Sequence, residues 1–179
     1  MPSVNQQQIH AGQELVHATM SSLQTERGVH VQTAIAGAAR VAGTFLFRSS
    51  GVSKANLTPG TYVASQEANE HVEQLVGVLF GMLGHFGVNL DEAKLGRPPE
   101  PGNEPNQGFL ETQRLLEPKY TAIRDRYGFS AHEVAIAAAV ATAMIVQYCS
   151  RQVDPHVGYG IAVQGFIEGA KTAPDPVVL

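Results

Sequence analysis

Residues 34–47 read AIAGAARVAGTFLF, a run of small and apolar residues with a single charge, Arg40, in the middle. A helix drawn through 29–48 is apolar on nearly every side, which is the pattern of a helix surrounded by other helices. A second run of this kind, AIAAAVATAMIV, occupies 135–146. Both runs carry alanine at steps of four, which lets helix backbones approach closely. The sequence therefore predicts an all-α single domain with these two helices at its centre.

Six helices are expected in total, and no stretch shows the pattern of a strand. Several boundaries carry capping signals, such as the capping box at 130–133 and the N-cap and first-turn proline at 154–155. A proline-rich linker, RPPEPGNEPNQG at 97–108, separates the first three helices from the last three. The expected helices cover about 5–26, 29–48, 65–86, 109–127, 131–151 and 155–171.

The order of helix types repeats on the two sides of the linker. An amphipathic helix, a buried helix rich in small residues and a helix that contains glycine follow one another in each half, and RGVHVQTAIAGAARVAG can be aligned with YGFSAHEVAIAAAVATA. Alanine-rich helices also align by chance. A duplicated three-helix unit and a chance likeness are therefore both open.

Composition limits the partners of the chain. Of its 179 residues, 44% are hydrophobic and 16% are charged, whereas soluble domains have about 25% charged residues. So little charge indicates that much apolar surface faces other helices or other subunits. The net charge is −4, and no block of Lys or Arg occurs, which argues against a nucleic-acid partner.

The chain carries no sign of a membrane or secretory location. Its first residues, MPSVNQQQIHAGQE, do not show the basic and apolar regions of a signal peptide, and Cys149 is the one cysteine. The longest uncharged apolar stretch, 134–146, is shorter than the roughly 18–20 residues of a membrane span. We expect a cytoplasmic protein with no membrane partner.

A possible metal site lies in the first helix, where His10, Glu14 and His17 share one face. Glu14 and His17 have the Glu-x-x-His spacing of di-iron helical bundles. That face is opposite the apolar stripe of the helix, and a second Glu-x-x-His is absent from the sequence. A solvated surface is the favoured interpretation, and a metal ion shared between subunits is the alternative.

Enzyme motifs are not found. The sequence has no Gly-x-Ser-x-Gly, His-Glu-x-x-His, paired Cys-x-x-Cys or phosphate-binding glycine loop, and we expect no cofactor. Cys149 lies late in an apolar helix, where a packing role is usual. His85 follows a helix edge of glycines, where a buried imidazole or one that faces a partner is expected.

Arg40 lies on a narrow polar strip of the helix at 29–48. A helical wheel places Thr33 and Thr44 beside it, with His30 and Arg48 at the border. We expect Arg40 to form an ion pair with a glutamate of a neighbouring helix. The glutamates considered are Glu14, Glu70, Glu73 and Glu133. The alternative is a binding site for a small anionic ligand on this strip, with His85 nearby.

Two functions remain open at this stage. The first is a non-enzymatic helical protein that acts as a homo-oligomer or through a protein partner, as the low charge, the small-residue faces and the apolar tail at 176–179 indicate. The second is a helical bundle that binds a small molecule, an anion or a metal, or that acts as an enzyme, with its pocket along the Arg40 strip.

Overall fold

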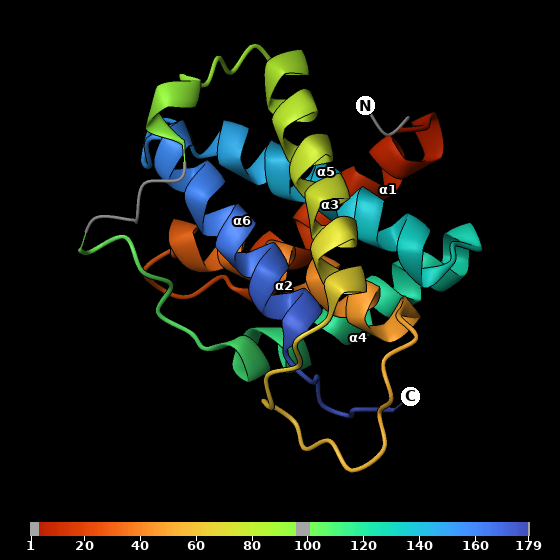
Figure 1. Cartoon of the computed structure of the whole chain (residues 1–179). Coiled ribbons are helices and arrows are strands. Elements are labelled where there is room, and N and C mark those ends of the chain that lie inside the picture. The colour runs from red at the N-terminus through yellow and green to blue at the C-terminus, as the bar shows by residue number, and fades with distance from the viewer. Residues whose placement is uncertain (1–3, 96–100, 179) are drawn as a thin grey trace.

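The computed structural model describes residues 4–95 and 101–178, and within these ranges it contains no strand. Residues 97–100 of the predicted linker and the last residue of the apolar tail lie outside the described residues, whereas 101–108 forms turns and bends. Six α-helices and one 3₁₀ turn build the fold (Figure 1). They are α1 (Gln6–Ser22), α2 (Val31–Ser49), α3 (Gln66–His85), η1 (Glu92–Lys94), α4 (Phe109–Tyr127), α5 (Ala131–Tyr148) and α6 (Pro155–Lys171).

The helices form three layers of two. The central layer is α2 and α5, as predicted, and both helices are buried along nearly their whole length. In Figure 1, α6 and α3 cross in front of this layer, with α6 packed on α2 and α3 on α5. On the other side, α1 packs on α5 and α4 packs on α2. The polar strip of α2 is therefore covered by α4 and α6.

This packing has the symmetry that a duplicated three-helix unit would give. If, among the helix contacts, α1, α2 and α3 are exchanged with α4, α5 and α6 respectively, each helix pair in extensive contact becomes another pair that is also in contact, or stays the same pair. For example, the contact of α1 with α5 becomes that of α4 with α2. The pairs α1 with α4, α2 with α5, and α3 with α6 are the ones that this exchange leaves unchanged. The repeat of helix types seen in the sequence thus has a counterpart in space.

The most extensive contact, between α2 and α6, depends on glycine. A Cβ atom on Gly169 would lie 2.0 Å from the carbonyl oxygen of Arg40, and one on Gly43 would lie 2.4 Å from that of Phe166. A Cβ atom on Gly165 would lie 2.7 Å from the Cβ atom of Ala39. Because these obstacles are mostly backbone atoms, no side chain can move aside to make room. Glycine at these positions sets the distance between the two helices.

Two predicted boundaries differ from the structure. The first helix ends at Ser22 rather than near 26, and Gly28 forms the following turn with a φ of 90°, bonded to Thr25 in both directions. The fifth helix ends at Tyr148 rather than 151. Beyond the buried C-cap residues Leu23 and Cys149, the residues predicted to continue each helix are polar and exposed, so a longer helix would bury no further apolar side chain there. The remaining helix boundaries agree with the prediction to within two residues.

One helix of the described residues, α5, is long and apolar enough to cross a membrane. Of its residues, 72% are buried inside the bundle, and each of the other five α-helices contacts it. Such burial is compatible with the central helix of a water-soluble protein.

Candidate functional site

Arg40 is buried, with 7% of its surface exposed, and its charge is neutralised inside the fold. Its Nε donates a hydrogen bond of 2.7 Å to Oε2 of Glu168 on α6. Its Nη1 donates to the main-chain oxygen of Gln107 at 2.8 Å, just before α4 begins. The guanidinium therefore joins α2 to α6 and to the end of the linker.

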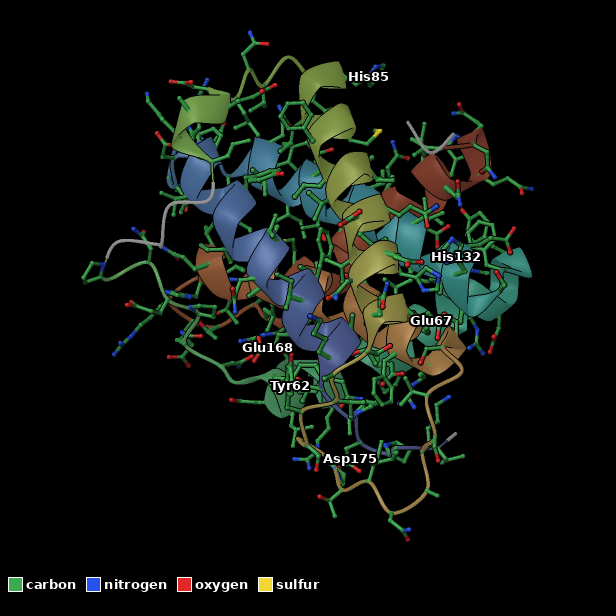
Figure 2. The ribbon with its side chains drawn as sticks, in the orientation of Figure 1. Tyr62, Glu67, His85, His132, Glu168 and Asp175 are labelled. Atoms are coloured by element: carbon green, nitrogen blue, oxygen red, sulfur yellow. The ribbon has the colours of Figure 1, made fainter. Side chains whose placement is uncertain are left out.

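The prediction of an ion pair across the bundle is correct in kind, but the four glutamates considered from the sequence are wrong. The partner is Glu168, which Figure 2 labels on α6. Its side chain is 32% exposed. Helix α6 lies against the polar strip because Gly165 and Gly169 allow close approach, and Glu168 is carried there with them. In sequence, Glu168 is the one acidic or basic residue between 157 and 170, which mirrors the isolation of Arg40 in α2.

Arg48 forms a second, more deeply buried ion pair. Its Nε and Nη2 bind the two carboxylate oxygens of Glu117 on α4, and both side chains are 6% exposed. Gln113, one turn earlier on α4, donates to the same carboxylate and to the main-chain oxygen of Asp175. Arg48 also donates to the main-chain oxygen of Val177. This cluster fastens the C-terminal tail to α2 and α4.

The two threonines of the strip are also used internally. Thr44 donates to the main-chain oxygen of Arg40 at 2.9 Å. Thr33 donates to Oδ1 of Asn106 at 2.6 Å and accepts from the main-chain N–H of Asn106 at 2.9 Å. His30 Nδ1 lies 2.8 Å from the Thr33 hydroxyl. Since that hydroxyl has already given its one proton to Asn106, His30 must donate through Nδ1, which leaves Nε2 as its free nitrogen.

A pocket of about 350 Å³ lies at the N-terminal end of the strip. It is partly enclosed between the turn that joins α1 to α2 and the end of the linker. His30 and Thr33 line it, whereas Arg40, Arg48, Thr44 and His85 do not. The predicted ligand residues are thus divided: two lie at a pocket, and the two arginines and Thr44 hold the fold together. The full lining is Leu23, Thr25, Arg27, Gly28, Val29, His30, Thr33, Asn106 and Gln107.

The possible metal residues share one open groove on α1, but they do not converge. Glu14 accepts hydrogen bonds from Arg126 and from the hydroxyl of Tyr127, and His10 is bonded to Gln6. The bond to Glu14 raises the pKa of Tyr127. No group of three or more His, Cys, Asp or Glu side chains in the described part of the chain is arranged to hold a metal ion. Within a single chain, Glu14 therefore binds groups of the protein itself, the guanidinium of Arg126 and the hydroxyl of Tyr127.

His85 does not lie near the strip. It is exposed at the end of α3, and Figure 2 places it at the far end of the molecule from Glu168 and Asp175. The expectation of an imidazole buried in the core is therefore wrong, because His85 lies on the outward side of the last turn of α3, whose Met82 and Leu83 are the residues that face the core. Cys149 is buried, as predicted, and burial raises the pKa of its thiol, which suits a packing role.

A pair of histidines lies where α3 meets α5. The rings of His71 and His132 have centroids 5.7 Å apart, and Nδ1 of His71 is buried without a hydrogen-bond partner in the described residues. Burial lowers the pKa of His132, and the neighbouring His71 lowers it further. The ring of His132 is therefore favoured in the neutral state. Sequence spacing gave no sign of this pair, since the residues belong to different halves of the chain.

Comparison of the chain with protein-family models, with curated proteins and with solved structures finds no match. Any functional conclusion must therefore come from the geometry itself.

Proposed function

We propose that this is a non-enzymatic helical protein that associates with a second copy of itself through the outer surface of α3 and α6. The surface, called here the α3–α6 face, comprises the outward residues of the uncharged parts of the two helices. These include Gly77, Phe80, Gly81, Gly84, Gly160, Val163, Ile167 and one exposed polar residue, Gln164.

The observation that carries the proposal is the absence of charge on two neighbouring outer helices. From 74 to 85, α3 has no acidic or basic residue except its terminal histidine, and from 155 to 167 α6 has none apart from one histidine. The central helix α5 carries no acidic or basic residue after Glu133 because other helices surround it. Outer helices normally place charged side chains on their solvent face, so an uncharged outer face is typical of an interface.

The glycines of this face support the same conclusion. Glycine inside a helix costs about 1 kcal/mol relative to alanine, and at Gly169 a close contact with α2 explains its presence. Gly160, in the middle of α6, has no such reason, because a Cβ atom there would meet nothing within 4 Å. Close approach of a helix from another molecule would supply the missing contact.

Phe80 gives the face an aromatic anchor. Its side chain stands between the glycines of α3, is 37% exposed, and meets the ring of Tyr159 edge-on with centroids 6.3 Å apart. Aromatic side chains that are partly exposed and already held by a neighbour are common at the centres of interfaces.

The experiment is to measure the mass in solution by light scattering and by sedimentation across a range of protein concentrations. We expect a species of twice the 19.1 kDa chain, and we expect Phe80→Glu to convert it to the monomer. Leu115→Glu is the matched control, because Leu115 is also 37% exposed but lies on α4, in the opposite layer. A wild-type chain that stays monomeric at every concentration contradicts the proposal, as does a Leu115→Glu variant that dissociates equally.

We also propose that the protein works in the cytoplasm. The support is its single cysteine, which is free and buried and so has no partner for a disulfide in the same chain.

A further inference from the structure

We propose that residues 89–95, called here the α6 strap, are held on the start of α6 by a latch that is released when His156 takes up a proton. The latch is the hydrogen bond of 2.8 Å from the main-chain N–H of Asp91 to Nε2 of His156. It is separate from the α3–α6 face, and it does not depend on self-association.

The strap follows α3, contains η1 and lies beside the start of α6 (Figure 1). Within the described residues, the bond from Asp91 to His156 is the one hydrogen bond that joins the strap to the rest of the chain. Its other hydrogen bonds are between its own residues. Leu90 and Leu95 are partly buried against the core. Loss of the latch would therefore leave only these apolar contacts to hold the strap in place.

The geometry fixes the protonation state of His156. A main-chain N–H can only donate a hydrogen bond, so Nε2 must accept it and carries no proton. Nδ1 lies 2.9 Å from Oδ1 of Asp154, and a carboxylate can only accept, so Nδ1 carries the proton of the neutral ring. The latch therefore requires one tautomer of the neutral imidazole.

Acid breaks the latch and strengthens the bond beside it. Because Nδ1 already carries a proton, a second proton must add at Nε2, and the new N–H would point at the N–H of Asp91. The bond from Nδ1 to Asp154 becomes an ion pair in the same step. The main-chain N–H and the imidazole of His156 hold the pKa of the Asp154 carboxyl below its ordinary value, so Asp154 stays ionised. Histidines ordinarily titrate near pH 6.5, so the strap is held above about this pH and released below it.

Asp154 is the charged group that contacts the imidazole in the part of the chain that the structure describes. Other titratable side chains belong to the strap or to the elements packed against the start of α6, and they form no hydrogen bond or ion pair with His156 there. These side chains are Asp91, Glu92, Lys94, His85, Cys149, Arg151 and His30. The state of the latch therefore depends on the proton of His156 itself.

The test follows the full chain, labelled with ¹⁵N, from pH 8 to pH 4.5 by nuclear magnetic resonance. We expect the ring signals of His156 and the amide signal of Asp91 to change with one shared midpoint. Protection of the Asp91 amide against hydrogen exchange, corrected for the intrinsic pH dependence of exchange, should fall about fivefold below that midpoint. Amides in the middle of α5 should keep their protection, because the bundle stays folded.

Variants assign the effect to His156. His156→Gln supplies an amide oxygen that accepts a hydrogen bond and does not titrate, so Asp91 should stay protected over the whole range. His156→Ala should leave Asp91 equally unprotected at both ends of the range. His85→Gln is the matched control, since His85 is an exposed histidine on the neighbouring helix α3, and it should behave as the wild type. Circular dichroism checks that each variant is folded.

Three results would overturn the proposal. Titration of His156 without any change in the protection of Asp91 removes the latch. A pH-dependent Asp91 amide in His156→Ala, or its loss in His85→Gln, assigns the effect to another group. Loss of protection in α5 at the same midpoint shows unfolding of the bundle instead of release of the strap.

Discussion

Replacing Gly169 with alanine tests whether the α2–α6 contact holds the fold together. The added Cβ atom would lie 2.0 Å from the carbonyl oxygen of Arg40 and 2.9 Å from the main-chain nitrogen of Thr44. Ordinary contact distances begin near 3.4 Å, so α6 must move away from α2 by about 1 Å or more. That shift also changes the position of Glu168, the next residue, against Arg40.

The net cost can be estimated from two opposing effects. Insertion of a methyl group into a packed core costs about 1–3 kcal/mol, and the upper value applies here because the obstacle is backbone. Alanine stabilises a helix by about 1 kcal/mol relative to glycine. The free energy of unfolding should therefore fall by about 2 kcal/mol. For a chain of this length, this lowers the melting temperature by about 4–8 °C.

The assay is thermal and urea unfolding, followed by circular dichroism at the lowest usable protein concentration so that association does not contribute. Gly160→Ala, in the same helix, is the control. With no atom within 4 Å of its Cβ position, it should raise the melting temperature by about 2–4 °C. If Gly169→Ala unfolds at or above the wild-type temperature, the reasoning from close helix approach is refuted.

Two further predictions concern the buried charges and the histidine pair. Arg48→Met should cost about 3–5 kcal/mol of unfolding free energy, since it strands Glu117 at 6% exposure. Arg40→Met should cost about 1–3 kcal/mol, because Glu168 is 32% exposed and can reach water; equal losses in denaturant unfolding would contradict this order. Because burial lowers the pKa of His132 in the folded state, the unfolded chain binds its proton more readily, so stability should fall as the pH drops below about 6.5. His132→Gln should flatten this dependence in urea unfolding between pH 5 and pH 8, and an unchanged slope would remove His132 as its source.

Most of the secondary structure could be predicted because its signals are local. Caps at Ser65, Ser130 and Asp154 mark helix starts, and the structure gives each of these side chains the expected main-chain N–H partner. Pro118 lies inside α4, and the helix runs through it. The Thr25–Gly28 turn was missed, since residues 23–26 have polar residues that suit a helix end or a turn equally.

The polar strip shows where prediction from sequence stops. A helical wheel correctly grouped Arg40 with Thr33 and Thr44, because residues on one face of a helix are fixed by its period. It could not choose Glu168 over four other glutamates, since that choice depends on which helix covers the strip. Nor could it find Gln107 or Asn106, whose irregular segment has no periodicity that would place them beside α2.

The sequence by itself determined the helical class, the six helices and the two central ones, because hydrophobic periodicity, capping residues and small-residue spacing act within a few residues of one another. Only the tertiary structure decided which charges pair, which glycines are in contact and where a pocket remains. Those outcomes depend on the order of the layers and on the distance between α2 and α6. Glycine contacts set that distance, and they join residues more than a hundred positions apart in the chain.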